Sequence, residues 1–307
     1  MSKLIVAGIT QLETIVKVKE IPIKYEPYTG ERDTIYIAAG GDAFNESLAL
    51  QWLGDEVEFM TVVGEHEDLS IFNPSNREVT LSTKYVLPVI KETPREVLLY
   101  DARRKGQRFE DLKDIRDAKY EMMLVDPLVP NCDMMVLSNV NFCRPFITKA
   151  VENNKKLAVK IHSFKRDKEI YNEDFLGNAN IIYFNDNSID EEPFEFVKEM
   201  ATKYDPEIIL LGQGEKGVII YDKIKDFTVH YDAVNTGQIV NTAGAGNALF
   251  ACFLHYFLKT GDSKLSVHKA LLFAANKIGY MGTSNGFMTE EQLEHWDELI
   301  WNPRGMM

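Results

Sequence analysis

Between residues 133 and 222, short apolar runs alternate with helix-like segments, and this alternation constrains the fold more than any other feature. The runs are DMMVLSNV, KKLAVKI, ANIIYFN, EIILLGQG and GVIIYD, and the helical patterns between them are PFITKAVENN and PFEFVKEMATKY. Nearly continuous apolar strands are typical of parallel sheets that helices cover on both faces. KLIVAGI, near the N-terminus, fits as a further central strand. We therefore expect an α/β fold.

Two strand-rich segments, residues 14–37 and 80–112, interrupt this pattern. The second contains KYVLPVI, REVLLYDAR and QRFED. Partial alternation of polar and apolar residues predicts strands with one solvated face. We expect both segments to form one small β-sheet beside a main domain of residues 1–13, 38–79 and 113–307.

The charge balance limits the partners of the chain. Its 307 residues carry 34 Lys and Arg against 47 Asp and Glu, a net charge of −13. An acidic surface disfavours nucleic acid and anionic membranes as non-specific partners. No apolar run reaches the ~18 residues typical of a membrane-spanning helix, and MSKLIVAGIT is expected to be a strand, not a signal peptide.

Cysteine usage favours a reducing compartment. Cys132, Cys143 and Cys252 form no Cys-x-x-Cys pair, and no histidine cluster accompanies them. A disulfide framework or a structural zinc site is therefore not expected. We expect a cytoplasmic protein.

GQGEKG, residues 212–217, matches the Gly-x-Gly-x-x-Gly pattern of dinucleotide-binding turns. That function requires a helix after the turn, but the next residues, VIIYD, are strand-like. We therefore favour a strand–turn–strand hairpin over a Rossmann oxidoreductase. A nucleotide can still approach the backbone at these glycines.

NTAGAGNALF, residues 241–250, joins an extended segment to a strongly apolar helix. The first N–H groups of a helix lack partners within it and carry the positive end of its dipole. Small residues there let an anion reach these groups, so the pattern suits a phosphate or a developing phosphoryl charge. The alternative is a tight connection whose glycines serve packing alone.

GGDAFNESLALQWLG, residues 40–54, pairs two glycines with Asn45 in the first turn of a predicted helix. The amide of Asn45 has both a donor and an acceptor for a substrate hydroxyl. The alternative is a helix cap, for which Asn45 and Asp42 are both suitable.

Together these motifs resemble the ribokinase-like (PfkB) family of carbohydrate kinases. The family has a Gly-Gly pair, an asparagine and an apolar helix near the N-terminus, and Asp-Thr-x-Gly-Ala-Gly-Asp before an apolar helix near the C-terminus. The resemblance implies a ribokinase-like doubly wound sheet flanked by helices, with a small β-sheet lid. It also implies ATP with Mg²⁺, a sugar or nucleoside acceptor, and a homodimer through the lid.

The resemblance assigns roles by position. Substrate contacts fall on Glu13, Gly41, Asn45, Thr93, Arg95 and Arg108. The anion hole falls on Gly244, Ala245 and Gly246, and nucleotide contacts fall on Asn185, Gly214 and Thr242. Asn247 stands at the general-base position and Asn241 beside the monovalent-cation position.

Three family carboxylates are replaced in this chain. The base is Asn247, the first signature aspartate is Asn241, and Ser188 stands where the family has the glutamate of Asn-x-x-Glu. An amide cannot accept a proton as a carboxylate does. We therefore expect nucleotide and polyol binding with impaired phosphoryl transfer, unless Glu65 or His66 substitutes as base. The alternative from another class is a non-catalytic sensor or scaffold, a pseudokinase.

Overall fold

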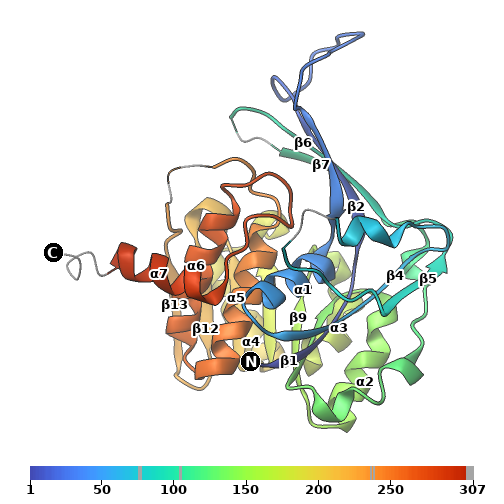
Figure 1. Ribbon diagram of the computed structural model, residues 1–307. Coiled ribbons are helices and arrows are strands. Elements are labelled where there is room, and N and C mark those ends of the chain that lie inside the picture. Colours follow the sequence, from blue (N-terminus) through green and yellow to red (C-terminus); the bar gives the residue numbers. More distant parts are fainter. Residues whose placement is uncertain (75–77, 104–105, 236, 238, 302–307) are drawn as a thin grey trace.

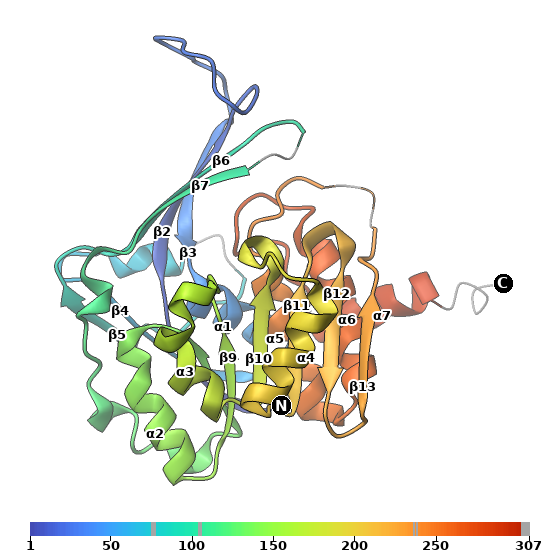
Figure 2. The same ribbon diagram turned by 180° about the vertical axis from the view of Figure 1, so that it is seen from behind.

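The computed structural model describes residues 1–74, 78–103, 106–235, 237 and 239–301. A large sheet lies between two layers of helices, and a small sheet projects from one edge of this body (Figures 1 and 2). The strands of the large sheet are β1 (Lys3–Ala7), β4 (Glu56–Gly64), β5 (Tyr85–Ile90), β8 (Met134–Ser138), β9 (Lys156–Lys160), β10 (Ile181–Asn185), β11 (Ile208–Gly212), β12 (Val218–Asp222) and β13 (Phe227–Tyr231).

The large sheet has the order β13-β12-β11-β10-β9-β8-β1-β4-β5. Its strands are parallel from β5 to β11, whereas β12 and β13 are antiparallel. The apolar runs that predicted the parallel strands are buried, as expected when helices cover both faces. The α/β expectation is confirmed.

Each face of the large sheet has its own helix layer. On one face lie α1 (Asp42–Trp52), α5 (Ala245–Thr260) and α6 (Ser263–Lys277), with α7 (Glu290–Trp301) packed against α6; on the other lie α2 (Arg144–Glu152), α3 (Glu169–Asn178) and α4 (Pro193–Tyr204) (Figures 1 and 2). Phe44, Phe250 and Phe273 belong to the core of the first face, and Phe146 and Phe196 to that of the second. Burying each such ring stabilises the fold by about 1.5–3 kcal/mol.

The small sheet has the order β3-β2-β6-β7, and we call it the lid. Its strands are β2 (Gln11–Lys17), β3 (Ile35–Gly40), β6 (Arg95–Tyr100) and β7 (Gly106–Asp111). Parts of both strand-rich segments, 14–37 and 80–112, thus pair in one sheet.

One strand predicted for the lid lies elsewhere. The run KYVLPVI forms β5, which pairs in parallel with β4 at the edge of the large sheet. Tyr85, Val86 and Ile90 are buried in the core there. Pro88 is compatible with this place, because a strand at the edge of a sheet can lack one hydrogen-bond donor. The alternation of this run reflects an edge strand of the main sheet.

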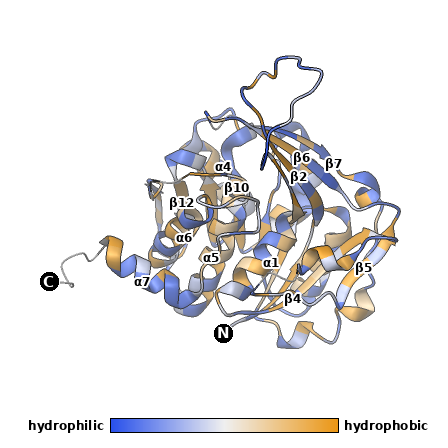
Figure 3. Ribbon diagram, turned by 45° about the horizontal axis from the view of Figure 1, so that its top comes forward, coloured by the Kyte–Doolittle hydropathy of each residue, from blue (hydrophilic) through white to orange (hydrophobic). Residues whose placement is uncertain are grey.

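The two faces of the lid differ. Residues in register share a face, so Glu13, Glu96 and Glu110 lie together on one side. The opposite side is apolar and exposed: Ile35 and Ile37 are each 64 % exposed, and Phe109 is 51 % exposed. Figure 3 shows hydrophobic residues in orange along these strands.

The hairpin interpretation of GQGEKG is confirmed. β11 and β12 are antiparallel, and a short 3₁₀ turn, Gly214–Lys216, joins them. Within the described ranges, no helix is both long and apolar enough to cross a membrane. All three cysteines are buried and unpaired.

Candidate functional site

The candidate site lies where the parallel strands end. Ser138, Lys160, Asn185 and Gly212 are the last residues of β8, β9, β10 and β11, and the lid projects from this edge of the large sheet (Figure 2). In open α/β sheets, ligands bind outside the carboxyl ends of the strands.

The glycine pair brings Glu13 onto the start of α1. Glu13 Oε1 accepts a hydrogen bond from the Gly41 N–H at 3.1 Å. A Cβ on Gly40 would lie 2.0 Å from Glu13 Oε1, and one on Gly41, whose φ is 93°, would lie 2.7 Å from the Ile9 carbonyl oxygen. Side chains at either position would displace Glu13 or the backbone, so the pair has a packing reason as well.

Thr283 joins Glu13 to Asn45. Its hydroxyl donates to Glu13 Oε2 at 2.5 Å and also lies 3.3 Å from Asn45 Oδ1. Glu13 and Asn45 are 3 % and 1 % exposed. The structure thus brings together three residues predicted for substrate binding, Glu13, Gly41 and Asn45. Neither Asn45 nor Asp42 caps α1 through its side chain, so the cap alternative is not supported.

Asp42 lies in an ion-pair chain that reaches the lid. Its Oδ1 is 2.6 Å from Lys160 Nζ and its Oδ2 is 2.8 Å from His162 Nδ1, while His162 Nε2 is 3.0 Å from Glu110 Oε1. Burial would raise the pKa of Asp42, but the charges of Lys160 and His162 hold it well below its usual value. The charge of Asp42 raises the pKa of His162 to about 10. Glu46, 3.8 Å from Lys160, is buried, and its pKa rises to about 8.

A second group of polar side chains lies on the face of the lid that carries Glu13, Glu96 and Glu110. Arg108 pairs with Glu96, and Gln11 donates to Glu96 and, at 3.4 Å, to Glu13. Burial raises the pKa of Glu96 to about 7 despite the opposing charge of Arg108. Arg108 is thus linked to the Glu13 cluster through Glu96 and Gln11.

Two further predicted contacts lie apart from this cluster. Thr93 is buried, and its hydroxyl accepts a hydrogen bond from the Gly64 N–H at 2.9 Å, which ties the chain before β6 to β4. Arg95 is exposed and in register with Leu12, so it lies on the face of the lid opposite Glu13. Their substrate contacts stay predictions.

The anion turn precedes α5. Gly244 has φ 82°, and a Cβ there would lie 2.4 Å from the Thr283 carbonyl oxygen. The Ala245 N–H already donates to the Thr242 carbonyl at 3.2 Å. No described residue accepts a hydrogen bond from the N–H of Gly246 or Asn247. These two groups are therefore free for an anion.

Asn247 is buried beside these donors. It is 6 % exposed, and its Oδ1 has no hydrogen-bond partner among the described residues. Buried side-chain polar atoms are usually paired. An unpartnered amide oxygen in the first turn of α5 is therefore suited to a ligand group that donates a hydrogen bond.

Tyr183 lies beneath the same turn and was not predicted. A Cβ on Gly246 would lie 2.7 Å from its hydroxyl oxygen, and one on Gly212 would lie 2.3 Å away. Lys160 Nζ is 5.8 Å from the centre of its ring. Tyr183 therefore lies between the ion-pair chain and the anion turn.

Three further predicted positions lie in or beside turns. Asn185 caps the short turn Asp186–Ser188, since its Oδ1 accepts from the Asn187 N–H at 3.3 Å. Gly214 opens the hairpin turn with φ 58°. The Asn241 side chain accepts from the Ala243 N–H at 2.7 Å and so shapes the anion turn.

The alternative bases are not brought to the site. Glu65 and His66 follow β4 and are exposed. The backbone N–H of Glu65 donates to the Ile90 carbonyl at 2.8 Å. No described interaction links either side chain to Asn247 or Glu13.

The residues of the anion turn and its surroundings fit a phosphate better than a metal ion. The free N–H groups of Gly246 and Asn247 can hold phosphate oxygens. In the described ranges, no group of three or more His, Cys, Asp or Glu side chains could hold a metal ion. Ser188 offers no carboxylate where the resemblance implies one, so we derive no step through Mg²⁺.

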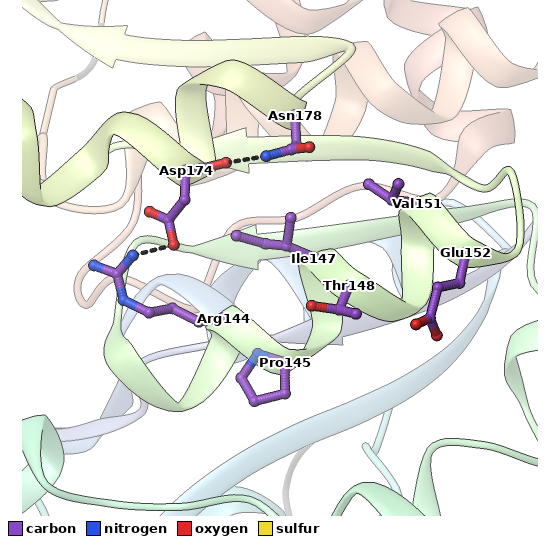
Figure 4. Close-up of a pocket in the computed structure, with 8 residues that line it drawn as sticks. All are labelled: Arg144, Pro145, Ile147, Thr148, Val151, Glu152, Asp174 and Asn178. Atoms are coloured by element: carbon purple, nitrogen blue, oxygen red, sulfur yellow. Dashed lines mark hydrogen bonds and ion pairs between the residues drawn. The ribbon is translucent and has the colours of Figure 1, made fainter.

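Two surface hollows lie away from these residues. One, of about 590 Å³, lies between α2 and α3, where Arg144 pairs with Asp174 (Figure 4). The other, of about 600 Å³, is lined by Trp52, Tyr280, Trp296 and the 284–288 loop, among others. Neither is lined by a predicted site residue.

Comparison with known proteins extends over nearly the whole chain. The ribokinase of Dictyostelium discoideum is 22 % identical over 318 residues, which cover 94 % of this chain and 98 % of that protein. The deoxyribokinase of Salmonella typhi is 35 % identical over 91 residues, but this match spans only 30 % of this chain and 29 % of that protein.

Solved structures share the fold. The Arabidopsis thaliana ribokinase complexed with ribose and ATP superposes with a TM-score of 0.76 at 16 % identity, covering 97 % of this chain and 99 % of that one. A microbiome-derived acarbose kinase has a TM-score of 0.80 at 17 % identity, covering 96 % and 99 %. Residues 1–290 match the pfkB family of carbohydrate kinases. This chain therefore belongs to the pfkB carbohydrate kinase family.

Proposed function

We propose that this protein binds a nucleotide and a sugar or nucleoside, and that it transfers the phosphoryl group far more slowly than ordinary kinases. The observation that carries this proposal is Asn247. A buried amide with an unpartnered oxygen stands beside the free N–H groups, and the sequence resemblance assigns this position to the family base.

Proton transfer explains the expected defect. The acceptor hydroxyl must lose a proton when it attacks the γ-phosphate, and Asn247 cannot take it. General-base catalysis contributes about 10²–10⁴ in rate, or roughly 3–5.5 kcal/mol of barrier. Positioning and charge stabilisation remain, and phosphoryl transfer depends strongly on both. The turnover that is left should therefore be slow.

The acceptor is proposed to bind between the lid and α1. Glu13 and Asn45 converge on Thr283 there, and carboxylate and amide groups suit the paired hydroxyls of a polyol. Two solved structures with this fold, an Arabidopsis thaliana ribokinase and a Burkholderia thailandensis nucleoside kinase, are complexes with ribose and ATP and with inosine, which favours a sugar or nucleoside as ligand of this chain. The polyol would compete with Thr283 for the same oxygens.

The second candidate is a non-catalytic sensor, and the ion-pair chain favours it. Glu110 on β7 is joined through His162 to Asp42 at the start of α1. A ligand between lid and α1 would therefore bias the position of the lid without any chemistry. Binding without turnover would assign the protein to this class.

The exposed side of the lid supports the homodimer that the resemblance implies. Ile35, Ile37 and Phe109 form an apolar surface that a second copy could cover. The three unpaired cysteines support a cytoplasmic location.

Calorimetry and an ADP-release assay together test the function. The protein is titrated with MgATP, ADP and a panel of sugars and nucleosides, and ADP release is measured with each acceptor that binds. We expect saturable binding of a nucleotide and at least one acceptor, with turnover below the ordinary ~1–100 s⁻¹ of kinases. Absence of nucleotide binding would refute the proposal, and turnover in the ordinary range would refute the impairment.

A further inference from the structure

Lys277, the last residue of α6, is a buried amine without a carboxylate in direct contact. Its side chain is 0 % exposed, and its Nζ donates to the Gly282 carbonyl at 2.5 Å. Among the described residues, no Asp or Glu lies within 4.0 Å of this ammonium group. Lysine is almost never fully buried unless it is paired.

A lysine on the same helix shows the usual arrangement. Lys269 is 3 % exposed, and its Nζ lies 2.5 Å from Glu294 and 2.8 Å from Asp297. Lys277 has no such direct ion pair; among the described residues, only the more distant charge of Glu13 favours its protonated form.

The segment that holds Lys277 supports the anion turn. The Ile278 carbonyl accepts hydrogen bonds from Val240 N–H at 2.8 Å and Asn241 N–H at 3.1 Å. The loop that begins at Gly282 continues to Thr283, whose carbonyl oxygen faces Gly244 so closely that a Cβ there would lie 2.4 Å from it. The Lys277 amine is therefore joined, through the Gly282–Thr283 loop, to the turn that carries the Gly246 and Asn247 N–H groups.

We propose that Lys277 is the internal countercharge for a phosphate bound at the Gly246 and Asn247 N–H groups. This inference rests on the nucleotide binding proposed above. Lys277 does not touch the phosphate in this arrangement; it is a positioning residue that acts through its field and through the Gly282–Thr283 loop. Asn247, whose buried oxygen has no partner among the described residues, lies in the first turn of α5 beside these groups.

The field of one buried charge is large enough to matter. At an effective dielectric constant of about 20, a unit charge within about 10 Å of an anion changes its affinity by roughly ten- to thirtyfold. Loss of the ammonium group should weaken ADP binding by that factor.

If Lys277 is this countercharge, the wild-type protein should take up a proton when ADP binds. Burial lowers the pKa of Lys277 to about 7, and the charge of Glu13 on β2 opposes part of this shift. Burial also raises the pKa of Glu13, whose side chain accepts a hydrogen bond from Thr283 in the loop that follows Gly282. A bound anion favours the protonated amine, so above pH 7 the wild-type protein should take up a proton when ADP binds.

The test compares Lys277→Met with Lys269→Met, a matched change eight positions earlier in α6. ADP is titrated by calorimetry at pH 7.5, 8.5 and 9.5, in two buffers of different ionisation enthalpy and without phosphate or sulfate. We expect Lys277→Met to bind ADP at least tenfold more weakly at pH 7.5 and to lose proton uptake. Lys269→Met should bind ADP as the wild type does.

The results distinguish a failure of the proposed nucleotide site from a failure of the proposed role of Lys277. If the wild type does not bind ADP, the nucleotide site itself is refuted, and Lys277 with it. If the wild type binds ADP but Lys277→Met binds equally well, the Lys277 inference alone is overturned. Wild-type binding without proton uptake between pH 7.5 and 9.5 overturns it as well, and this measurement remains valid if the variant does not fold.

Discussion

His162 Nε2 lies 3.0 Å from Glu110 Oε1, and this contact ties the lid to the large sheet. The opposite nitrogen of the ring is 2.8 Å from Asp42, so the histidine bridges two carboxylates. Both pairs are partly or fully buried, where charge-assisted hydrogen bonds are strongest. The position of the lid is therefore coupled to the first turn of α1.

Glu110→Gln should loosen the lid. Removing one charge of a partly buried pair costs about 1 kcal/mol, so hydrogen exchange of the β6 and β7 amides should accelerate by roughly fivefold. Asp111→Asn, at the next residue, is the control, because Asp111 pairs with Lys113 and not with His162. Equal exchange in the two variants would contradict the coupling.

The pH dependence of His162 follows from its raised pKa of about 10. A group whose pKa rises on folding stabilises the fold fully below its unfolded value, near 6.5, and loses this contribution as pH rises to about 10. The difference in unfolding free energy between wild type and His162→Gln should therefore be constant below pH 6 and shrink between pH 6.5 and 10. Urea unfolding at several pH values measures it, and a difference that stays level up to pH 10 would speak against the bridge.

The contribution of Lys277 to folding stability should rise with pH, whereas that of His162 falls. The folded-state pKa of Lys277, about 7, lies below the unfolded value, so the unfolded chain binds more protons between pH 7 and 10.5 and wild-type stability should rise there relative to Lys277→Met. Thermal unfolding of both proteins at pH 6, 8 and 10 measures this difference. A parallel pH dependence in the two would show that Lys277 is not buried as an unpaired amine.

Gly244→Ala should destabilise the fold as well as the anion turn. The left-handed conformation at φ 82° and the Thr283 oxygen 2.4 Å from the added Cβ both oppose the substitution, at about 1–3 kcal/mol. Gly177→Ala is the control, since nothing lies within 4 Å of its Cβ position. Denaturant midpoints that match for the two variants would exclude strain at the turn.

Ile37→Lys should separate the proposed dimer. A lysine on the exposed apolar side of the lid would place a charge in the interface, whose burial is costly. Sedimentation velocity should show a wild-type dimer and a monomeric variant with unchanged circular dichroism. A wild-type monomer at micromolar concentration would refute the interface.

The sequence predicts those helices and strands whose apolar pattern matches the face that they bury in the structure. PFEFVKEMATKY forms α4 and the apolar run after Gly246 forms α5, which ends where Gly261 adopts φ 67°. α3 was not predicted, because its buried residues, Asn172, Phe175 and Leu176, form no repeating apolar face. β5 was assigned to the wrong sheet because alternation marks any half-buried strand, whichever sheet it joins.

Sequence motifs predict only those site residues that lie within the motifs themselves. Gly41, Asn45 and the 241–247 turn carry recognisable patterns, whereas Thr283 reaches Asn45 across 238 positions of the chain. The polar residues TSNG after α6 were the available signal for Thr283. Asp42, Glu110 and the pair of Lys160 and His162 lie in three separate segments with ordinary compositions, so only the folded chain reveals their ion pairs.

Asn247→Asp is the most direct test of the central claim, that the missing carboxylate limits catalysis. ADP release is measured with an acceptor that binds, for wild type, Asn247→Asp and the triple variant Asn247→Asp, Ser188→Glu, Asn241→Asp. We expect the single change to raise turnover by about 10²-fold or more, and the triple variant to exceed it non-additively. Wild-type turnover of ~1–100 s⁻¹, or no increase in Asn247→Asp while nucleotide and acceptor binding are intact, would contradict the claim.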